Sequence, residues 1–287
     1  MTQLFKIDLK EIYPLETLSG KNVASVFYHD IFDYPLTAQE LIRWEAGRRL
    51  TVKDKSLTID FRNGFYFLAG REASILKRLL RKRISARKLR IARKAGQILQ
   101  FIPSVKAVFV TGALAMENAS SDSDIDLLVV TRKGRLWTTR LFSLVLFKMI
   151  GFPLRKYGDK DQKDKLCLNM WLDEGSLGWS KGDRNSYTAH EIAQVVPLIN
   201  KDNIYERFVW ENKWVKTFWP NALKVIKQQG EVDKKGSFLG NLFESWARKL
   251  QFIYMRRKIT REVVTPNRAL FHPHDWGKVI LSRLTSR

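Results

Sequence analysis

The chain has 287 residues, of which 45% are hydrophobic, enough for one large domain or two to three small ones. It carries 51 Lys and Arg against 29 Asp and Glu, a formal net charge of +22, which attracts polyanions. Nucleic acid (RNA or DNA) is the commonest such partner, with anionic membranes and acidic proteins as alternatives. A single cysteine excludes an internal disulfide. We expect a cytoplasmic protein without a membrane span, because no apolar stretch reaches the required ~20 residues and the N-terminus does not resemble a signal peptide.

Residues 1–70 are predicted to form a winged-helix-like domain. Residues 22–32 have the apolar spacing of a helix, and Thr37 and Glu40 form a capping box at the start of a second one. Two alternating apolar segments flank Asn63-Gly64, the pair best suited to a type I′ hairpin turn. Two helices and a hairpin are typical of a winged helix, although the recognition helix is poorly marked.

Residues 71–103 are predicted to form a basic connecting helix, in which Glu72 is the only acid up to residue 100. A run of charge usually marks a solvated connector, but charges of one sign repel each other unless a polyanion or facing acids relieve them. Phosphate contact and a plain connecting role are therefore weighed equally. The cations concerned are Lys77, Arg78, Arg81, Lys82, Arg83, Arg87, Lys88, Arg90, Arg93 and Lys94.

Strands alternate with helices between residues 104 and 200, which predicts an α/β or α+β domain. The remainder, residues 201–287, is predicted to be a C-terminal helical region. The expected strands of the middle domain are 105–110, 125–130 and 166–172, and its expected helices are 135–150 and 188–198.

Asp124 and Asp126 stand two residues apart at the start of an apolar strand, so both carboxylates project from one face. Two carboxylates are costly to bury unpaired, and Mg²⁺ or Mn²⁺ removes that cost while also binding substrate phosphates. The preceding strand ends in Thr111-Gly112, where a glycine lets backbone amides approach a phosphate closely. The sequence therefore indicates a site for a divalent cation and a phosphate.

The stretch from Gly112-Ala113, through ten intervening positions, to Asp124-Ile125-Asp126 resembles the signature of the nucleotidyltransferase superfamily. That superfamily includes DNA polymerase β, CCA-adding enzymes and antibiotic nucleotidyltransferases. The resemblance covers residues 105–172 and implies a polymerase β-like domain, an α+β fold with a mixed sheet. By this resemblance Asp124 and Asp126 would be catalytic and would hold two metal ions, and Gly112 and its neighbours would cradle the triphosphate of an NTP.

The remaining site residues follow from the same resemblance. Ala113 replaces the usual Ser or second Gly, so that Thr111, Ser121 or Ser123 would have to supply the missing hydroxyl contact. Arg132 and Arg140 follow the metal strand and would neutralise charge on pyrophosphate, although surface cations of this kind are as often merely solvated.

The third carboxylate of the family is harder to place. The position expected to be acidic holds Asn169, and Asp173 lies on the same face of that strand but near its end. Glu191 is a further candidate, yet a capping box from Thr188 to Glu191 would explain it structurally. We therefore assign Asp173 as the third catalytic residue and keep Glu191, or a missing third carboxylate, as alternatives.

These residues predict a metal-dependent nucleotidyltransferase that transfers a nucleoside monophosphate from an NTP to an acceptor hydroxyl. The charge favours a nucleic-acid acceptor over a small molecule or a protein. The alternative is a catalytically inactive module with this fold that binds nucleic acid or a nucleotide. The third carboxylate discriminates between the two, and the sequence leaves the oligomeric state open.

Overall fold

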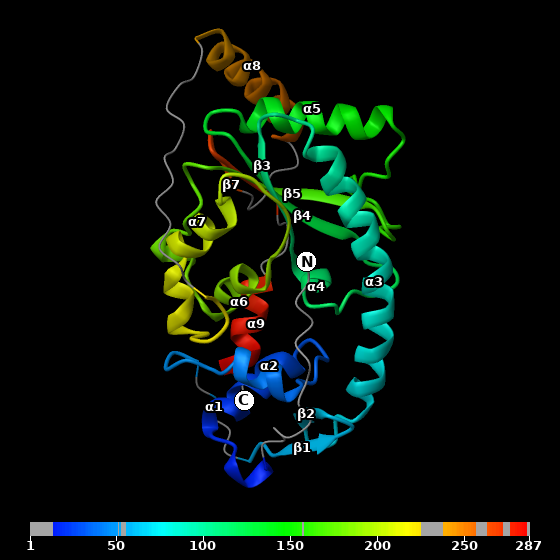
Figure 1. Ribbon diagram of the computed structural model, residues 1–287, viewed down its shortest axis with the longest axis vertical. Coiled ribbons are helices and arrows are strands. Elements are labelled where there is room, and N and C mark those ends of the chain that lie inside the picture. Colours follow the sequence, from blue (N-terminus) through cyan, green and yellow to red (C-terminus); the bar gives the residue numbers. More distant parts are fainter. Residues whose placement is uncertain are drawn as a thin grey trace.

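The computed structural model describes residues 14–50, 52, 56–156, 158–224, 238–256, 263–271 and 276–285. A six-stranded sheet lies in the middle of the molecule, with the N-terminal helices at one end and helices α5 and α8 at the other (Figure 1). Helix α3 runs along one side and passes both the N-terminal elements and the sheet. Within the described residues, no helix is both long enough and apolar enough to cross a bilayer.

The N-terminal elements are α1 (Gly20–Asp30), α2 (Ala38–Arg43) and a hairpin of β1 (Ile59–Arg62) and β2 (Phe65–Leu68). The predicted capping box is present, because the Glu40 carboxylate accepts a hydrogen bond from the Thr37 amide at 2.9 Å. The hairpin is confirmed too, since Asn63 and Gly64 both have the positive φ that a type I′ turn requires. Among the described residues between α2 and β1 there is no helix, so the recognition helix of a winged helix is not seen there.

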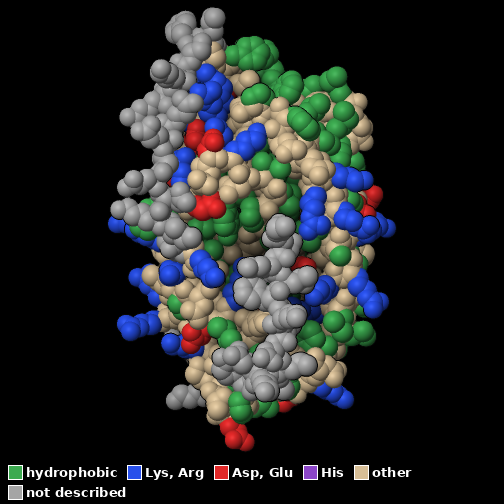
Figure 2. All heavy atoms as spheres, in the orientation of Figure 1, with side chains coloured by type: hydrophobic (Ala, Val, Ile, Leu, Met, Phe, Trp, Pro, Cys, Tyr) green, Lys and Arg blue, Asp and Glu red, His purple; other side chains and the backbone are tan. Residues whose placement is uncertain are grey.

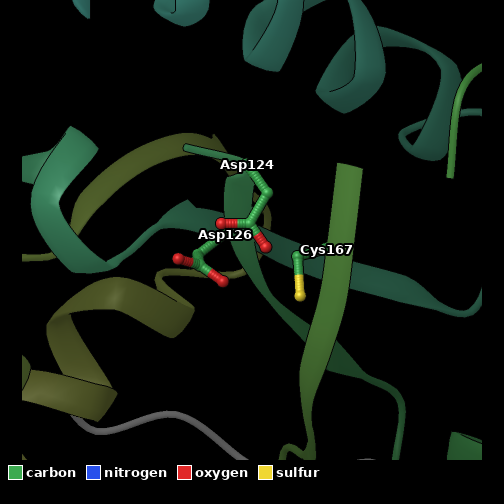
Figure 3. Close-up of side chains that lie close together, drawn as sticks. All are labelled: Asp124, Asp126 and Cys167. Atoms are coloured by element: carbon green, nitrogen blue, oxygen red, sulfur yellow. The ribbon is translucent and has the colours of Figure 1, made fainter. Parts of the chain in front are cut away.

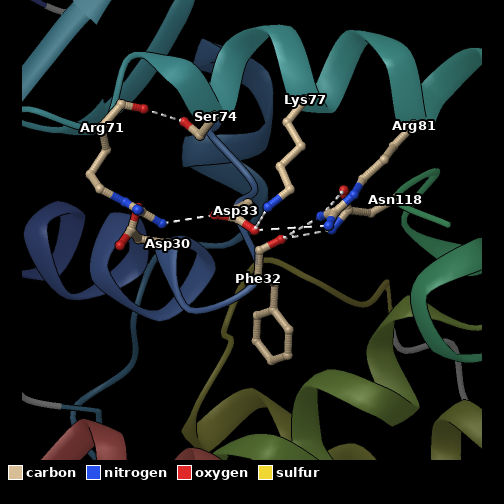
Figure 4. Close-up of polar contacts among 8 residues, drawn as sticks. All are labelled: Asp30, Phe32, Asp33, Arg71, Ser74, Lys77, Arg81 and Asn118. Atoms are coloured by element: carbon tan, nitrogen blue, oxygen red, sulfur yellow. Dashed lines mark hydrogen bonds and ion pairs between the residues drawn. The ribbon is translucent and has the colours of Figure 1, made fainter. Parts of the chain in front are cut away.

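The predicted basic helix is α3 (Ala73–Leu99), and its 27 residues span about 40 Å. A facing acid relieves part of its charge, because Lys77 Nζ lies 2.5 Å and Arg81 Nη2 lies 3.8 Å from Asp33 Oδ2 (Figure 4). Arg81 Nη1 also donates to the carbonyl oxygen of Phe32 at 3.1 Å. Just before the helix, Arg71 pairs with Asp33 at 2.8 Å. This end of α3 therefore fastens the N-terminal elements to the rest of the chain.

The central sheet has the strand order β6-β3-β4-β5-β8-β7. Among the strands that the structure describes in this sheet, β4 and β5 run parallel and the other neighbouring pairs are antiparallel, so the predicted α+β fold with a mixed sheet is confirmed. The bounds are β3 (Val105–Val110), β4 (Ile125–Thr131), β5 (Leu166–Asp173), β6 (Val196–Asn200), β7 (Val263–Val264) and β8 (Arg268–Leu270). The predicted helix 135–150 is α5 (Leu136–Met149).

The predicted helix 188–198 is wrong in its second half. Helix α6 (Ser186–Gln194) stops early, and the chain continues as β6, antiparallel to β3. Pro197 lies inside this strand, opposite Phe109. Because β6 is an edge strand, a proline without an amide proton is tolerated there, and its presence hides the strand in the sequence.

The predicted C-terminal helical region, residues 201–287, also contains strands that the sequence did not predict. The segment contains α7 (Ile204–Glu211), α8 (Phe238–Met255) and α9 (Trp276–Thr285), but β7 and β8 extend the sheet beyond β5. These strands have two and three residues, too few for an alternating pattern to reveal them. The C-terminal part thus completes the sheet as well as covering it.

Candidate active site

The two aspartates lie where β4 begins. Asp124 directly precedes the strand and Asp126 lies within it, while Ile125 between them points into the core. Cys167 of the neighbouring β5 lies opposite Asp126 in the parallel register. One side-chain ligand atom from each of Asp124, Asp126 and Cys167 lies within 4.8 Å of the others, and Figure 3 shows the two carboxylates side by side with the thiol beside them. The predicted convergence of the aspartate pair is thus realised.

Negative charge is concentrated at this pair and only partly balanced. Burial, and next the charge of Asp124, raise the pKa of Asp126 from 3.8 to about 7. Arg155 Nη1 lies 2.5 Å from Asp124 Oδ2 and 3.7 Å from Cys167 Sγ. Burial and the two carboxylates raise the pKa of the Cys167 thiol far above its ordinary value, so the sulfur stays protonated. The carboxylate oxygens of the pair are the donors that a hard divalent cation prefers.

The Gly112 loop (Thr111 to Ala113) lies directly against Asp126. The Thr111 amide donates to the Asp126 carbonyl oxygen at 3.1 Å, and Gly112 then turns the chain with φ of 61° into the short helix α4 (Gly112–Ala115). A Cβ atom on Gly112 would lie 3.0 Å from Asp126 Oδ2. Both the backbone conformation and the close approach require glycine. Since the first amides of a helix have no acceptor within it, those of Gly112 and Ala113 are available to a phosphate next to the carboxylate.

A buried lysine within the basic run of α3 holds the loop before Asp124. Lys88 of α3 is fully buried, and its Nζ donates to the carbonyl oxygens of Ser123 at 2.6 Å and Ser121 at 3.3 Å. It also pairs with Asp164 at 2.8 Å. In the sequence, Lys88 lies at helical spacing from the other buried residues of α3, and this spacing could have identified it as buried. A cation on the apolar face of a helix needs buried partners.

Asn169 occupies the position on β5 where an acid was expected. Its Nδ2 donates to Asp126 Oδ1 at 3.0 Å, so the side chain lies beside the aspartate pair. Its Oδ1 is buried and has no hydrogen-bond partner among the described residues. A buried carbonyl oxygen without a donor is costly. A bound cation or a hydroxyl group of a ligand would satisfy it.

Glu191 of α6 faces the same site. Helix α6 is capped by Asn185, which pairs with Thr188, so the capping box predicted from Thr188 to Glu191 does not form. Burial and the charge of Asp126 raise the pKa of Glu191 to about 7. Gln194 Nε2 donates to Glu191 Oε1 at 2.7 Å and to the Gly112 carbonyl oxygen at 3.3 Å, so α6 and the Gly112 loop are joined. Glu191 therefore does not have the helix-capping role that the sequence suggested.

The helix that carries Glu191 is packed against the N-terminal elements. His190 stacks on Trp44 with ring centroids 4.1 Å apart, and its Nε2 lies 3.1 Å from His29 Nε2. Burial lowers the pKa of both histidines, so neither carries a charge at neutral pH. Trp219 packs edge-on against the same cluster. A buried aromatic cluster therefore fixes α6.

Three other predicted site residues lie elsewhere. Asp173 stands six residues beyond Cys167 on β5, about 20 Å along the strand, where it accepts hydrogen bonds from the amides of Gly134 and Gly175. Arg132 follows β4 at that same far end. Arg140 of α5 donates to Gln251 Oε1 at 2.5 Å. β5 carries one extra residue between Cys167 and Met170, so Asp173 pairs with Thr131 and lies on the face opposite to Asp126; the face predicted from simple alternation is therefore wrong.

Of the predicted phosphate ligands, Ser123 already uses its hydroxyl within the loop, where Oγ donates to the Ser120 carbonyl oxygen at 3.0 Å. Thr111 is buried at the start of α4, and Ala113 follows Gly112 in the same turn. The structure thus gathers Thr111, Gly112 and Ala113 at the aspartate pair.

Residues 92–174 match the family model of the nucleotidyltransferase domain. The matched segment extends from within α3 to just past β5, and includes the Gly112 loop, the aspartate pair and Asn169 but not Glu191. The resemblance to the nucleotidyltransferase superfamily is confirmed by this match. No curated protein matches the chain.

Proposed function

Since residues 92–174 carry a nucleotidyltransferase domain, we propose that this chain transfers a nucleoside monophosphate from an NTP to an acceptor hydroxyl, with Asp124 and Asp126 holding a divalent cation. The observation that carries the proposal is the contact between Gly112 and the Asp126 carboxylate. It sets backbone amides suited to a phosphate beside the carboxylates that would bind the cation of that phosphate.

The donor set fits Mg²⁺ or Mn²⁺. Asp124 and Asp126 supply carboxylate oxygens, and the orphaned Asn169 Oδ1 supplies a carbonyl oxygen beside them. Carboxylate and carbonyl oxygens are the ligands that these hard cations prefer. When bound, the cation would neutralise charge on the phosphates and stabilise the leaving pyrophosphate. Arg155, 32% exposed and paired with Asp124, would contribute a second positive charge on that side.

Glu191 is proposed as the third carboxylate and as the base that accepts the proton of the attacking hydroxyl. Its pKa of about 7 suits a proton acceptor near neutral pH. In the step, the hydroxyl oxygen bonds to the α-phosphorus, its proton passes to Glu191, and the bond to pyrophosphate breaks. Gln194 would hold the carboxylate in place by its hydrogen bond at 2.7 Å. Asp173 has no part in this proposal, because of its place at the far end of β5.

A nucleic-acid acceptor is favoured by the charge distribution. The cations Arg83, Arg90 and Lys94 are exposed on α3, have spacings of seven and four residues, and make no ion pair with any residue that the structure describes. Such a stripe on one helix face is suited to phosphates of a nucleic-acid backbone. Affinity for RNA should therefore fall steeply with salt, and a flat salt response would contradict the contact.

One observation favours the alternative, a module with this fold that binds without transferring. Asn169 cannot act as a base, and it stands where the family has an acid. If Glu191 lies too far from the reacting hydroxyl, nucleotide and cation would bind and remain unchanged.

Both functions are tested by incubating the full chain with each labelled NTP, Mg²⁺ or Mn²⁺, and RNA, and measuring label transfer and nucleotide binding. We expect transfer by the wild type, its loss in Asp126→Asn with weaker nucleotide binding, and its loss in Glu191→Gln with nucleotide binding retained. Asp173→Asn is the matched control and should keep transfer. Cation-dependent nucleotide binding without transfer would favour the binding module, and absence of both would refute either function.

A further inference from the structure

Two polar residues of helix α8, Glu244 and Gln251, point inward against α5. The Glu244 carboxylate accepts hydrogen bonds from the backbone amides of Trp137 at 2.7 Å and Thr138 at 2.9 Å, and so caps the start of α5. One to two turns further along α8, Gln251 Nε2 donates to the Trp137 carbonyl oxygen at 2.8 Å. Ala247 between them is fully buried. These contacts fix which face of α8 points away from the molecule.

That outward face is apolar. Its large side chains recur at helical spacing and are between 45% and 72% exposed, namely Leu242, Phe243, Trp246, Leu250, Ile253 and Tyr254. Helix α5 and the residue after it continue the surface with Phe142, Val145, Met149 and Ile150. Figure 2 shows hydrophobic side chains gathered at the top of the molecule, the end at which Figure 1 places α5 and α8. We call these ten residues the α5–α8 patch. An exposed apolar surface of this extent marks an interaction site.

The charges around the α5–α8 patch have one sign. Lys148 of α5, Lys249 of α8 and Arg256, which follows α8, are exposed, and Arg248 is partly exposed. Glu244 is the only acid among the described residues of α5 and α8, and it is engaged with the first amides of α5. The patch is therefore apolar and cationic, in a chain of net charge +22.

We propose that the α5–α8 patch docks on the surface of an anionic lipid bilayer, with α8 lying in the plane of the headgroups. Aromatic and aliphatic side chains on one face, with lysine and arginine beside them, are what an interfacial helix requires. The aliphatic members of the patch would gain nothing from nucleic acid. A second copy of this chain is disfavoured, because a two-fold contact would set like charges against each other. This inference is independent of the proposed transfer reaction.

The test is cosedimentation of the full chain with vesicles, either of phosphatidylcholine alone or of equal parts of phosphatidylcholine and phosphatidylglycerol. We expect binding to the anionic vesicles and at least tenfold weaker binding to the neutral ones. Ile253→Glu and Trp246→Glu should each weaken binding severalfold, since a carboxylate would be carried into the interface. Leu76→Glu is the matched control, because Leu76 is equally exposed, at 64%, but lies on α3 outside the patch.

The variants alter exposed positions, so their melting temperatures should equal that of the wild type, which separates lost docking from lost folding. Absence of vesicle binding would overturn the proposal, as would equal weakening by Leu76→Glu. Light scattering measures whether the chain is a dimer in solution. A dimer that Ile253→Glu dissociates would assign the patch to a second copy of the chain instead of a bilayer. Transfer to RNA in the absence of vesicles should not change in Ile253→Glu.

Discussion

Replacement of Asp126 by asparagine should stabilise the fold when no divalent cation is present. The folded protein raises the pKa of this carboxyl from 3.8 to about 7, mainly through burial and then through the charge of Asp124. Above pH 7 the folded chain therefore carries a charge that the unfolded chain holds more easily, whereas near pH 4 the penalty disappears. The amide that replaces the carboxylate would keep an oxygen to accept the hydrogen bond from Asn169. Asp126→Asn should thus exceed the wild type in stability at pH 8 but not at pH 4.

The size of the effect follows from the same shift. A shift of about three pKa units corresponds to about 4 kcal/mol in the free energy of unfolding. This value is an upper limit, because the carboxylate is partly exposed and stays partly hydrated. We expect about 1–2 kcal/mol, a rise in melting temperature of about 2–6 °C. Thermal melts in EDTA at pH 4 and pH 8 measure it.

Asp122→Asn is the matched control for this prediction. Its carboxylate lies in the exposed part of the same loop, and a hydrogen bond from Ser120 lowers its pKa, so its removal should give no stabilisation. Addition of Mg²⁺ or Mn²⁺ should raise the melting temperature of the wild type and have a smaller effect on Asp126→Asn. A variant that melts below the wild type at pH 8 in EDTA, or a difference that does not change with pH, would refute the electrostatic reasoning.

Three further substitutions test the parts around the pair. Gly112→Ala should lower the free energy of unfolding by about 1 kcal/mol, because alanine disfavours the positive φ and its Cβ would press on Asp126. The same substitution should weaken nucleotide binding, which titration with NTP measures. Lys88→Met should cost about 3 kcal/mol and weaken Mn²⁺ binding, since the carbonyl oxygen of Ser123 loses its buried donor; equal Mn²⁺ affinity in folded variant and wild type would exclude a positioning role. Asn169→Asp should raise the pKa of Asp126 further, so that the protein melts lower in EDTA and gains more from Mg²⁺ than the wild type does; calorimetry checks the cation affinity.

The sequence was most informative where several local signals coincided. The Asn63-Gly64 turn, the capping box at Thr37 and the strands before and after the Gly112 loop were all predicted with nearly the observed bounds. It was least informative at the edges of the sheet. Strand β6 contains Pro197, and β8 has only three residues, so neither shows an alternating pattern. Their pairing is set by β3 and β5, which lie far away along the chain.

For the candidate site, spacing along the chain predicted the Gly112 loop and the aspartate pair but misassigned the residues contributed by other elements. Asp173 satisfied the alternation in the sequence, but an extra residue of β5 between Cys167 and Met170 reverses the face, and alternation gives no distance along the strand. Glu191 was set aside because of a capping box that Asn185 and Thr188 form instead. Lys88 was counted as surface charge, because only the packing of α3 against the loop shows that it is buried.

The position of Glu191 links the N-terminal elements to the candidate active site. Glu191 lies outside the segment that matches the nucleotidyltransferase family, on a helix that the His29–His190 contact and the Trp44 ring hold in place. Helix α3 is anchored at one end to the acids of α1 and its following turn, and further along its Lys88 holds the loop before Asp124. If Glu191 is the base, the N-terminal elements are part of the scaffold of the active site, whatever else they bind.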